Sequence, residues 1–178
     1  MKTPVLSKIL SLTQILLIAV LPFPSASASA STDLVDYTCK KTPYTVFCGT
    51  ALRFDPRSST ADTTTLGLIM VNEVEAHAKS TLAKIKHLRG KAPDPRTRRA
   101  LASCEQSYGF IISAMVPPSK EGLTKGNYKF TVEYMNAAAN DVLECEAGFG
   151  GSKSPISDPN NYELKAAKVA SAIAGLLL

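Results

Sequence analysis

The sequence has no tryptophan and only two histidines among its 178 residues. So few histidines leave little material for a metalloenzyme or for a nucleophile that a histidine activates. The glycine-rich phosphate-binding motifs, the HExxH zinc motif and the GxSxG nucleophile motif are also missing. The common nucleotide-binding, zinc-protease and hydrolase classes are therefore excluded. We expect a protein that is not an enzyme and that holds no metal and no cofactor.

Charged residues are also sparse, at 20% of the chain, against 45% hydrophobic residues. This composition is too apolar for a disordered tail, and the length suits one domain. Between positions 84 and 99, however, seven basic residues face a single acid, Asp94. Aromatic residues do not interleave with them, so we predict no nucleic-acid partner. We expect a solvated face there, with attraction to anionic pectin as the weaker alternative.

Residues 1–30 have the pattern of a secretory signal peptide. Lys2 and Lys8 precede an apolar run over 9–21, and small-residue cleavage sites end at Ala28 and Ala30. The run is shorter than the roughly 20 residues of a membrane-spanning helix. We therefore predict secretion to the extracellular space and no membrane partner.

All four cysteines lie beyond this segment, at Cys39, Cys48, Cys104 and Cys145. An even number in a secreted chain favours two disulfides, and the spacings are too long for a structural zinc site. Three connectivities are open, of which we favour the local pairs Cys39–Cys48 and Cys104–Cys145. In the chain-entropy model these loops contribute about 2.7 and about 4 kcal/mol.

Hydrophobic residues recur at three- and four-residue intervals over most of the remaining chain, which predicts helices. We expect helices over 61–89, from Asp94 to a stop at Pro117–Pro118, over 127–146, and from Asp158 to the C-terminus. Strand signals are nearly absent. The predicted fold is all-α, with a helical hairpin over 31–60 and an up-down four-helix bundle over 61–178. We predict that the hairpin contributes little to the bundle core.

The hydrophobic C-terminus, residues 169–178, belongs to the last of these helices. A cleaved membrane-anchor signal would need a polar spacer before its apolar tail, and none is present. Earlier in the chain, Glu73 and His77 lie four residues apart. We interpret them as an exposed ion pair, because no third metal ligand is evident.

Three stretches resemble the plant invertase and pectin methylesterase inhibitor family. They are the first two cysteines with the segment 52–62, the Leu101-x-x-Cys104-x-x-x-Tyr108 segment, and the region from Ala137 to Phe149. The resemblance spans residues 31–178 in order, and is strongest to the plane-tree pollen group of invertase inhibitors. It implies a hairpin followed by a four-helix bundle, with the first cysteine bonded to the second and the third to the fourth.

The resemblance also implies a function, which is to bind an enzyme and block its substrate cleft. Invertase inhibitors share a Pro-Lys-Phe motif between the second and third bundle helices. The matching stretch here is Asn127, Tyr128, Lys129 and Phe130, in which tyrosine replaces the proline. The expected partner is a pectin methylesterase or an acid invertase in a one-to-one complex. The alternative is a non-inhibitory binding or structural bundle of the pollen- or seed-allergen type.

Overall fold

The computed structural model describes residues 34–151 and 154–178. The expected signal peptide lies outside these residues. Within them the chain is helical without any strand, which confirms the predicted all-α class. None of the described helices is long and apolar enough to cross a membrane. Residues 34–39 are helical, and the further helices are α2 (Thr45–Phe54), α3 (Thr63–Lys91), α4 (Pro95–Phe110), α5 (Val116–Thr124), α6 (Tyr128–Ala147) and α7 (Ser157–Gly175).

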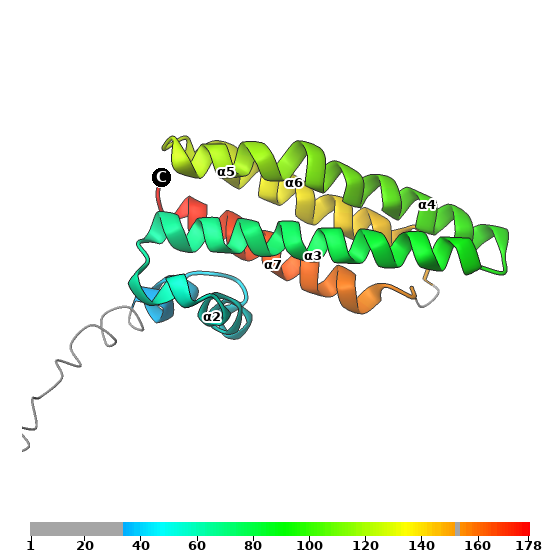
Figure 1. Cartoon of the computed structure of the whole chain (residues 1–178), viewed down its shortest axis with the longest axis horizontal. Coiled ribbons are helices and arrows are strands. Elements are labelled where there is room, and N and C mark those ends of the chain that lie inside the picture. The colour runs from blue at the N-terminus through cyan, green and yellow to red at the C-terminus, as the bar shows by residue number, and fades with distance from the viewer. Residues whose placement is uncertain (1–33, 152–153) are drawn as a thin grey trace, which may run out of the picture.

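The bundle is built from α3, the rod formed by α4 and α5, α6 and α7. These four rods run alternately up and down, so that the α3–α4 turn and the α6–α7 loop share one end and the α5–α6 turn lies at the other (Figure 1). Every rod contributes fully buried side chains to one core, for example Met70, Tyr108, Met135 and Ile173. The periodic apolar positions of the sequence therefore do face one another.

Aspartate caps start two of the long helices. The Asp62 carboxylate accepts a hydrogen bond from the Thr65 backbone N–H at 2.7 Å, and Asp94 accepts one from the Thr97 N–H at 2.8 Å. Each bond satisfies a backbone donor that the first helical turn leaves unpaired. These bonds hold the pKa of both carboxyl groups below the usual range. The predicted helix start at Asp94 is confirmed, with Asp94 as the capping residue.

The stop predicted at Pro117–Pro118 is wrong, because the rod continues to Thr124. A wider π-helical turn over Ile111–Met115 separates α4 from α5 and places both prolines in the first turn of α5. Proline is tolerated there, since the N–H groups of a first turn need no partner within their own helix. The Ser119 hydroxyl donates to the Met115 carbonyl at 2.8 Å and satisfies an acceptor at this junction.

The N-terminal hairpin lies beside one end of the bundle (Figure 1) and is closed by the Cys39–Cys48 disulfide, called here the hairpin disulfide. Its inner side is buried: Cys48 and Leu52 are inaccessible and belong to the same core as the bundle. The Phe47 ring meets the Tyr162 ring of α7 edge to face, with centroids 5.0 Å apart. The hairpin thus shares the core more closely than the sequence predicts, while Phe54 at the end of α2 is exposed.

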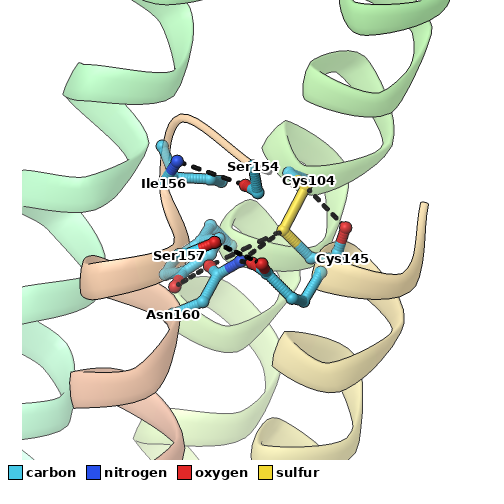
Figure 2. Close-up of a disulfide and its surroundings, with 8 residues drawn as sticks. Cys104, Cys145, Ser154, Ile156, Ser157 and Asn160 are labelled. Carbon is cyan, nitrogen blue, oxygen red and sulfur yellow. Dashed lines mark hydrogen bonds between the residues drawn. A yellow bond between two sulfur atoms is a disulfide. The ribbon is translucent and has the colours of Figure 1, made fainter. Parts of the chain in front are cut away.

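The second disulfide, Cys104–Cys145, joins α4 to α6 and is called here the bundle disulfide. A cluster of polar side chains beside this disulfide is hydrogen-bonded to α7 (Figure 2). The Asn160 amide donates to a Glu146 carboxylate oxygen at 2.5 Å, and its oxygen accepts from the Tyr108 hydroxyl at 2.9 Å. Three of the four rods are therefore held together at this end of the bundle.

The interpretation of Glu73 and His77 as an exposed ion pair is wrong. The His77 Nδ1 atom lies 2.6 Å from Oε2 of Glu163, a residue of α7 that is wholly buried. Glu73 instead accepts a hydrogen bond from the Tyr162 hydroxyl at 2.5 Å. Both side chains of α3 turn toward α7, where the buried Glu163 carboxyl pairs with His77 and the Tyr162 hydroxyl donates to the half-buried Glu73.

Candidate target-binding site

The four sequence-predicted residues lie where α5 turns into α6. The turn runs through Lys125, Gly126 and Asn127, and Gly126 has a φ of 76°, a left-handed conformation that glycine adopts without a steric cost. Asn127 is the residue before the first turn of α6, and its carbonyl accepts from the Phe130 N–H at 3.0 Å. The turn therefore reverses the chain within three residues and starts α6 at Tyr128.

The turn is held against the body of the bundle by a close approach of α5 to α6. Gly122 makes this approach feasible, because a Cβ atom there would lie 2.7 Å from the Thr131 hydroxyl oxygen and 3.0 Å from the Asn127 carbonyl oxygen. The Thr131 hydroxyl is buried and donates to the Ser119 carbonyl at 2.8 Å. These contacts leave the turn little freedom to move relative to the core.

Three of the four predicted residues face solvent. Asn127 and Lys129 are exposed, and 53% of the Phe130 surface is accessible, a high value for an aromatic residue in a helix. Tyr128 is half-buried and packs against the core. The residue that replaces the family proline is thus a structural contact, whereas the matching lysine and phenylalanine are presented outward.

A shallow hollow of about 200 Å³ adjoins Phe130. Sequence reasoning missed the half of its wall that α5 supplies, and also Tyr134 of α6. One signal was readable in the sequence, since Phe130 and Tyr134 are four residues apart and so share a face of α6. The lining residues are Pro118, Glu121, Gly122, Asn127, Phe130 and Tyr134.

The charges around the turn are arranged as short pairs along each helix. Lys125 lies 2.6 Å from Glu121, and this ammonium holds the pKa of the Glu121 carboxyl below its usual range. Lys129 is only loosely paired, with its Nζ 3.8 Å from a Glu133 oxygen and 79% of its side chain exposed. Exposed pairs of this kind contribute little stability, so the Lys129 ammonium is free to bind another carboxylate.

The arrangement offers binding groups and no catalytic constellation. A cation, an adjacent exposed aromatic ring and a small hollow lie together on a rigid turn. Among residues 34–151 and 154–178, no three His, Cys, Asp or Glu side chains gather in a way that would hold a metal ion. The site is thus suited to contacting a concave acidic surface on another molecule.

Comparison with known proteins shows which family this chain resembles. The family model described as plant invertase/pectin methylesterase inhibitor matches residues 33–174. An Arabidopsis thaliana protein named cell wall / vacuolar inhibitor of fructosidase 1 is 36% identical over 140 residues, which cover 79% of this chain and 67% of that protein. A Platanus acerifolia protein named for invertase inhibition is 30% identical over 159 residues, covering 84% and 88% of the two chains.

The fold also has a solved counterpart. A mutant form of a pectin methylesterase inhibitor from Arabidopsis superposes with a TM-score of 0.67 at 22% identity, over 79% of this chain and 94% of that one. The resemblance read from the sequence, the plane-tree protein included, is confirmed.

Proposed function

This chain belongs to the plant invertase/pectin methylesterase inhibitor family, and on that premise we propose that it blocks an acid invertase or a pectin methylesterase by occluding its active-site cleft. Family members are inhibitors, so the chain is an enzyme inhibitor and not itself an enzyme. We propose a one-to-one complex, formed outside the cell or in the vacuole after removal of the N-terminal signal segment.

The observation that carries the proposal is the outward presentation of Lys129 and Phe130 on a fixed turn. A glycoside hydrolase such as invertase uses a pair of carboxyl groups that flank the scissile bond. An ammonium group that enters such a cleft gains a charge-assisted contact, and the neighbouring ring fills space that a sugar would occupy. Both residues project from one end of the bundle, a shape that can enter a cleft.

Rigidity strengthens this mode of binding. The Gly122 approach and the buried Thr131 hydrogen bond fix the turn before any partner arrives. Association then orders few additional side chains, so more of the contact energy appears as affinity. A flexible loop with the same residues would bind more weakly.

Of the two targets, we favour invertase. The exposed Lys129-Phe130 pair and the fructosidase inhibitor among the relatives support this choice. A pectin methylesterase would instead be bound by helix faces, where Phe110 of α4 is the exposed aromatic residue, at 56%. The non-inhibitory alternative predicts no effect on either enzyme.

Alanine variants distinguish these readings. Lys129→Ala and Phe130→Ala should each weaken invertase inhibition by about 1–3 kcal/mol, as expected for interface anchors. Matched controls exist for both: Phe110 is equally exposed on α4, and Lys79 is an exposed lysine that pairs with the glutamate four residues earlier. Neither Phe110→Ala nor Lys79→Ala should change the invertase inhibition constant.

The opposite pattern has a clear meaning. Loss of esterase inhibition in Phe110→Ala, with Phe130→Ala unaffected, would move the binding surface from the α5–α6 turn to the face of α4. Equal inhibition constants for all four variants and the unmodified protein would show that the turn does not bind the enzyme.

A further inference from the structure

The end of the bundle opposite the α5–α6 turn carries a concentration of positive charge. It spans the last two turns of α3, the α3–α4 turn and the first two turns of α4, at the right of Figure 1. All of its basic side chains are exposed. We call this surface the basic end; its members are Lys84, Lys86, Arg89, Lys91, Arg96, Arg98 and Arg99.

Little within the fold neutralises these charges. In the described structure, Arg89 is the one residue of the basic end that forms an ion pair, with Glu105 at 3.1 Å. Arg98 donates to the Ala92 carbonyl at 3.3 Å, a bond that leaves its charge in place. The single acid in the segment, Asp94, is already committed to capping α4. The positive charges of the basic end therefore repel one another, with little acidic charge nearby to offset the repulsion.

The fold explains part of this charge but not all of it. Arg89 and Lys91 lie in the last turn of α3, where a cation is favourable against the negative end of the helix dipole. Arg96 and Arg98 lie in the first turn of α4, which contains no acid. A cation at that position is unfavourable, because it lies at the positive end of the helix dipole. These arginines thus cost stability in the free protein.

We propose that the basic end binds an anionic polysaccharide of the polyuronate class, such as pectin whose methyl esters have been removed. Such a chain carries carboxylates at regular intervals along one strand, so several can meet the exposed guanidinium and ammonium groups together. The methyl esters of the same polymer are neutral and would not attract these cationic groups. Hydrolysis by a pectin methylesterase is the reaction that creates the charge the basic end recognises.

A membrane surface is the less suitable partner for these residues. Binding in a lipid interface needs exposed apolar side chains beside the basic ones. In the described part of the chain, none of the large exposed hydrophobic residues lies between positions 84 and 99. The surface is charged without an apolar anchor, which fits a hydrated polymer.

The location of the basic end allows simultaneous binding at both ends. The 29-residue helix α3 is roughly 44 Å long. The α5–α6 turn lies at the far end of that length (Figure 1). A polysaccharide held at one end would therefore leave the candidate enzyme-binding turn accessible, and would keep the inhibitor where esterified substrate has already been processed.

The test uses the full secreted chain and immobilised polygalacturonate as the probe. A triple variant, Lys91→Gln/Arg96→Gln/Arg99→Gln, removes three side chains that make no ion pair or hydrogen bond in the described structure. The control, Lys40→Gln/Lys41→Gln/Lys165→Gln, removes the same net charge near the hairpin. Circular dichroism is recorded for both variants to check that they fold.

We expect the unmodified protein to bind polygalacturonate at low ionic strength, to release it as salt is raised, and to ignore highly methyl-esterified pectin. The triple variant should bind roughly tenfold or more weakly, while the control stays within about twofold. The assay contains no enzyme, so its outcome is independent of the proposed inhibition.

Three results would overturn the proposal. The first is an absence of polygalacturonate binding at low ionic strength. The second is an equal loss of binding in the control, which would show that only net charge matters. The third is binding to phosphatidylserine vesicles without binding to polygalacturonate.

Discussion

Glu163 makes the stability of this protein depend on pH in a direction opposite to that of most carboxyl groups. Its side chain is inaccessible, and only one of its oxygens has a hydrogen-bond partner in the described structure, His77. Burial raises the pKa of Glu163 to about 7, an effect that the nearby His77 opposes and the Glu73 carboxylate reinforces. The folded protein therefore holds the Glu163 proton more tightly than the unfolded chain does.

The sign and size of the effect follow from this difference. A carboxyl whose pKa rises on folding stabilises the protein fully below its unfolded value, and the contribution is lost as pH rises through the folded value. The pKa of Glu163 rises from the ordinary value of 4.5 to about 7. This rise of roughly 2.5 pH units corresponds to about 3 kcal/mol of stability. We expect the free energy of unfolding to fall by about this amount between pH 4.5 and pH 7.5.

The variant that tests this is Glu163→Gln. A glutamine amide is uncharged and can hydrogen-bond to His77 Nδ1 in place of the carboxyl group, so the fold should survive. The variant should lose most of the fall in stability across the window and should be more stable than the unmodified protein at pH 7.5. Urea unfolding at fixed ionic strength, with the disulfides intact, provides the measurement.

A second variant tests whether the effect comes from the burial of Glu163 or from the loss of any carboxylate. Glu75 lies on α3 and is bonded by Lys120 and Lys79, which hold its pKa below the usual range. Its contribution is therefore lost only at pH values below the unfolded pKa, so Glu75→Gln should leave the pH dependence above pH 5 unchanged. The reasoning is refuted if unmodified stability is flat or rises over this window, or if Glu163→Gln and the unmodified protein show the same slope.

Three further predictions concern the bundle, each measured as a urea midpoint. Replacing both cysteines of the bundle disulfide by alanine should destabilise by about 4 kcal/mol, and replacing those of the hairpin disulfide by about 2.7 kcal/mol; the reverse order would contradict the loop-length argument. Gly122→Ala should destabilise by about 1–3 kcal/mol through overpacking against Thr131, whereas Gly109→Ala, which meets no atom within 4 Å, should stabilise by up to about 1 kcal/mol. Tyr108→Phe removes the buried hydrogen bond to Asn160 and should cost about 1–3 kcal/mol; an unchanged midpoint would mean that the bond contributes nothing.

The features that sequence could predict were those encoded within a few consecutive turns. Apolar spacing located α3, α4, α6 and α7 but not α5, and Asp94 before Pro95 marked the start of α4. The prolines at 117 and 118 misled the prediction for a local reason as well. A proline ends a regular helix, but a preceding π turn removes that requirement, and no residue pattern over 111–115 announces it.

Features that depend on distant residues were out of reach. Glu163 lies 86 positions from His77, so no local spacing could show that the two side chains pair. The hollow beside Phe130 could not be predicted for the same reason. Its far wall comes from α5, and only the close approach at Gly122 brings that helix near. The exposed Lys129 and Phe130 were predictable because a family pattern named them.

Titration of purified acid invertase and pectin methylesterase with the unmodified protein tests the central claim most directly. We predict that the residual activity of one of the two enzymes falls to near zero at one inhibitor per enzyme, and that the two proteins then co-elute as a single complex. Full activity of both enzymes at micromolar inhibitor throughout the acidic pH range would contradict inhibition and leave the bundle as a binding protein of another kind.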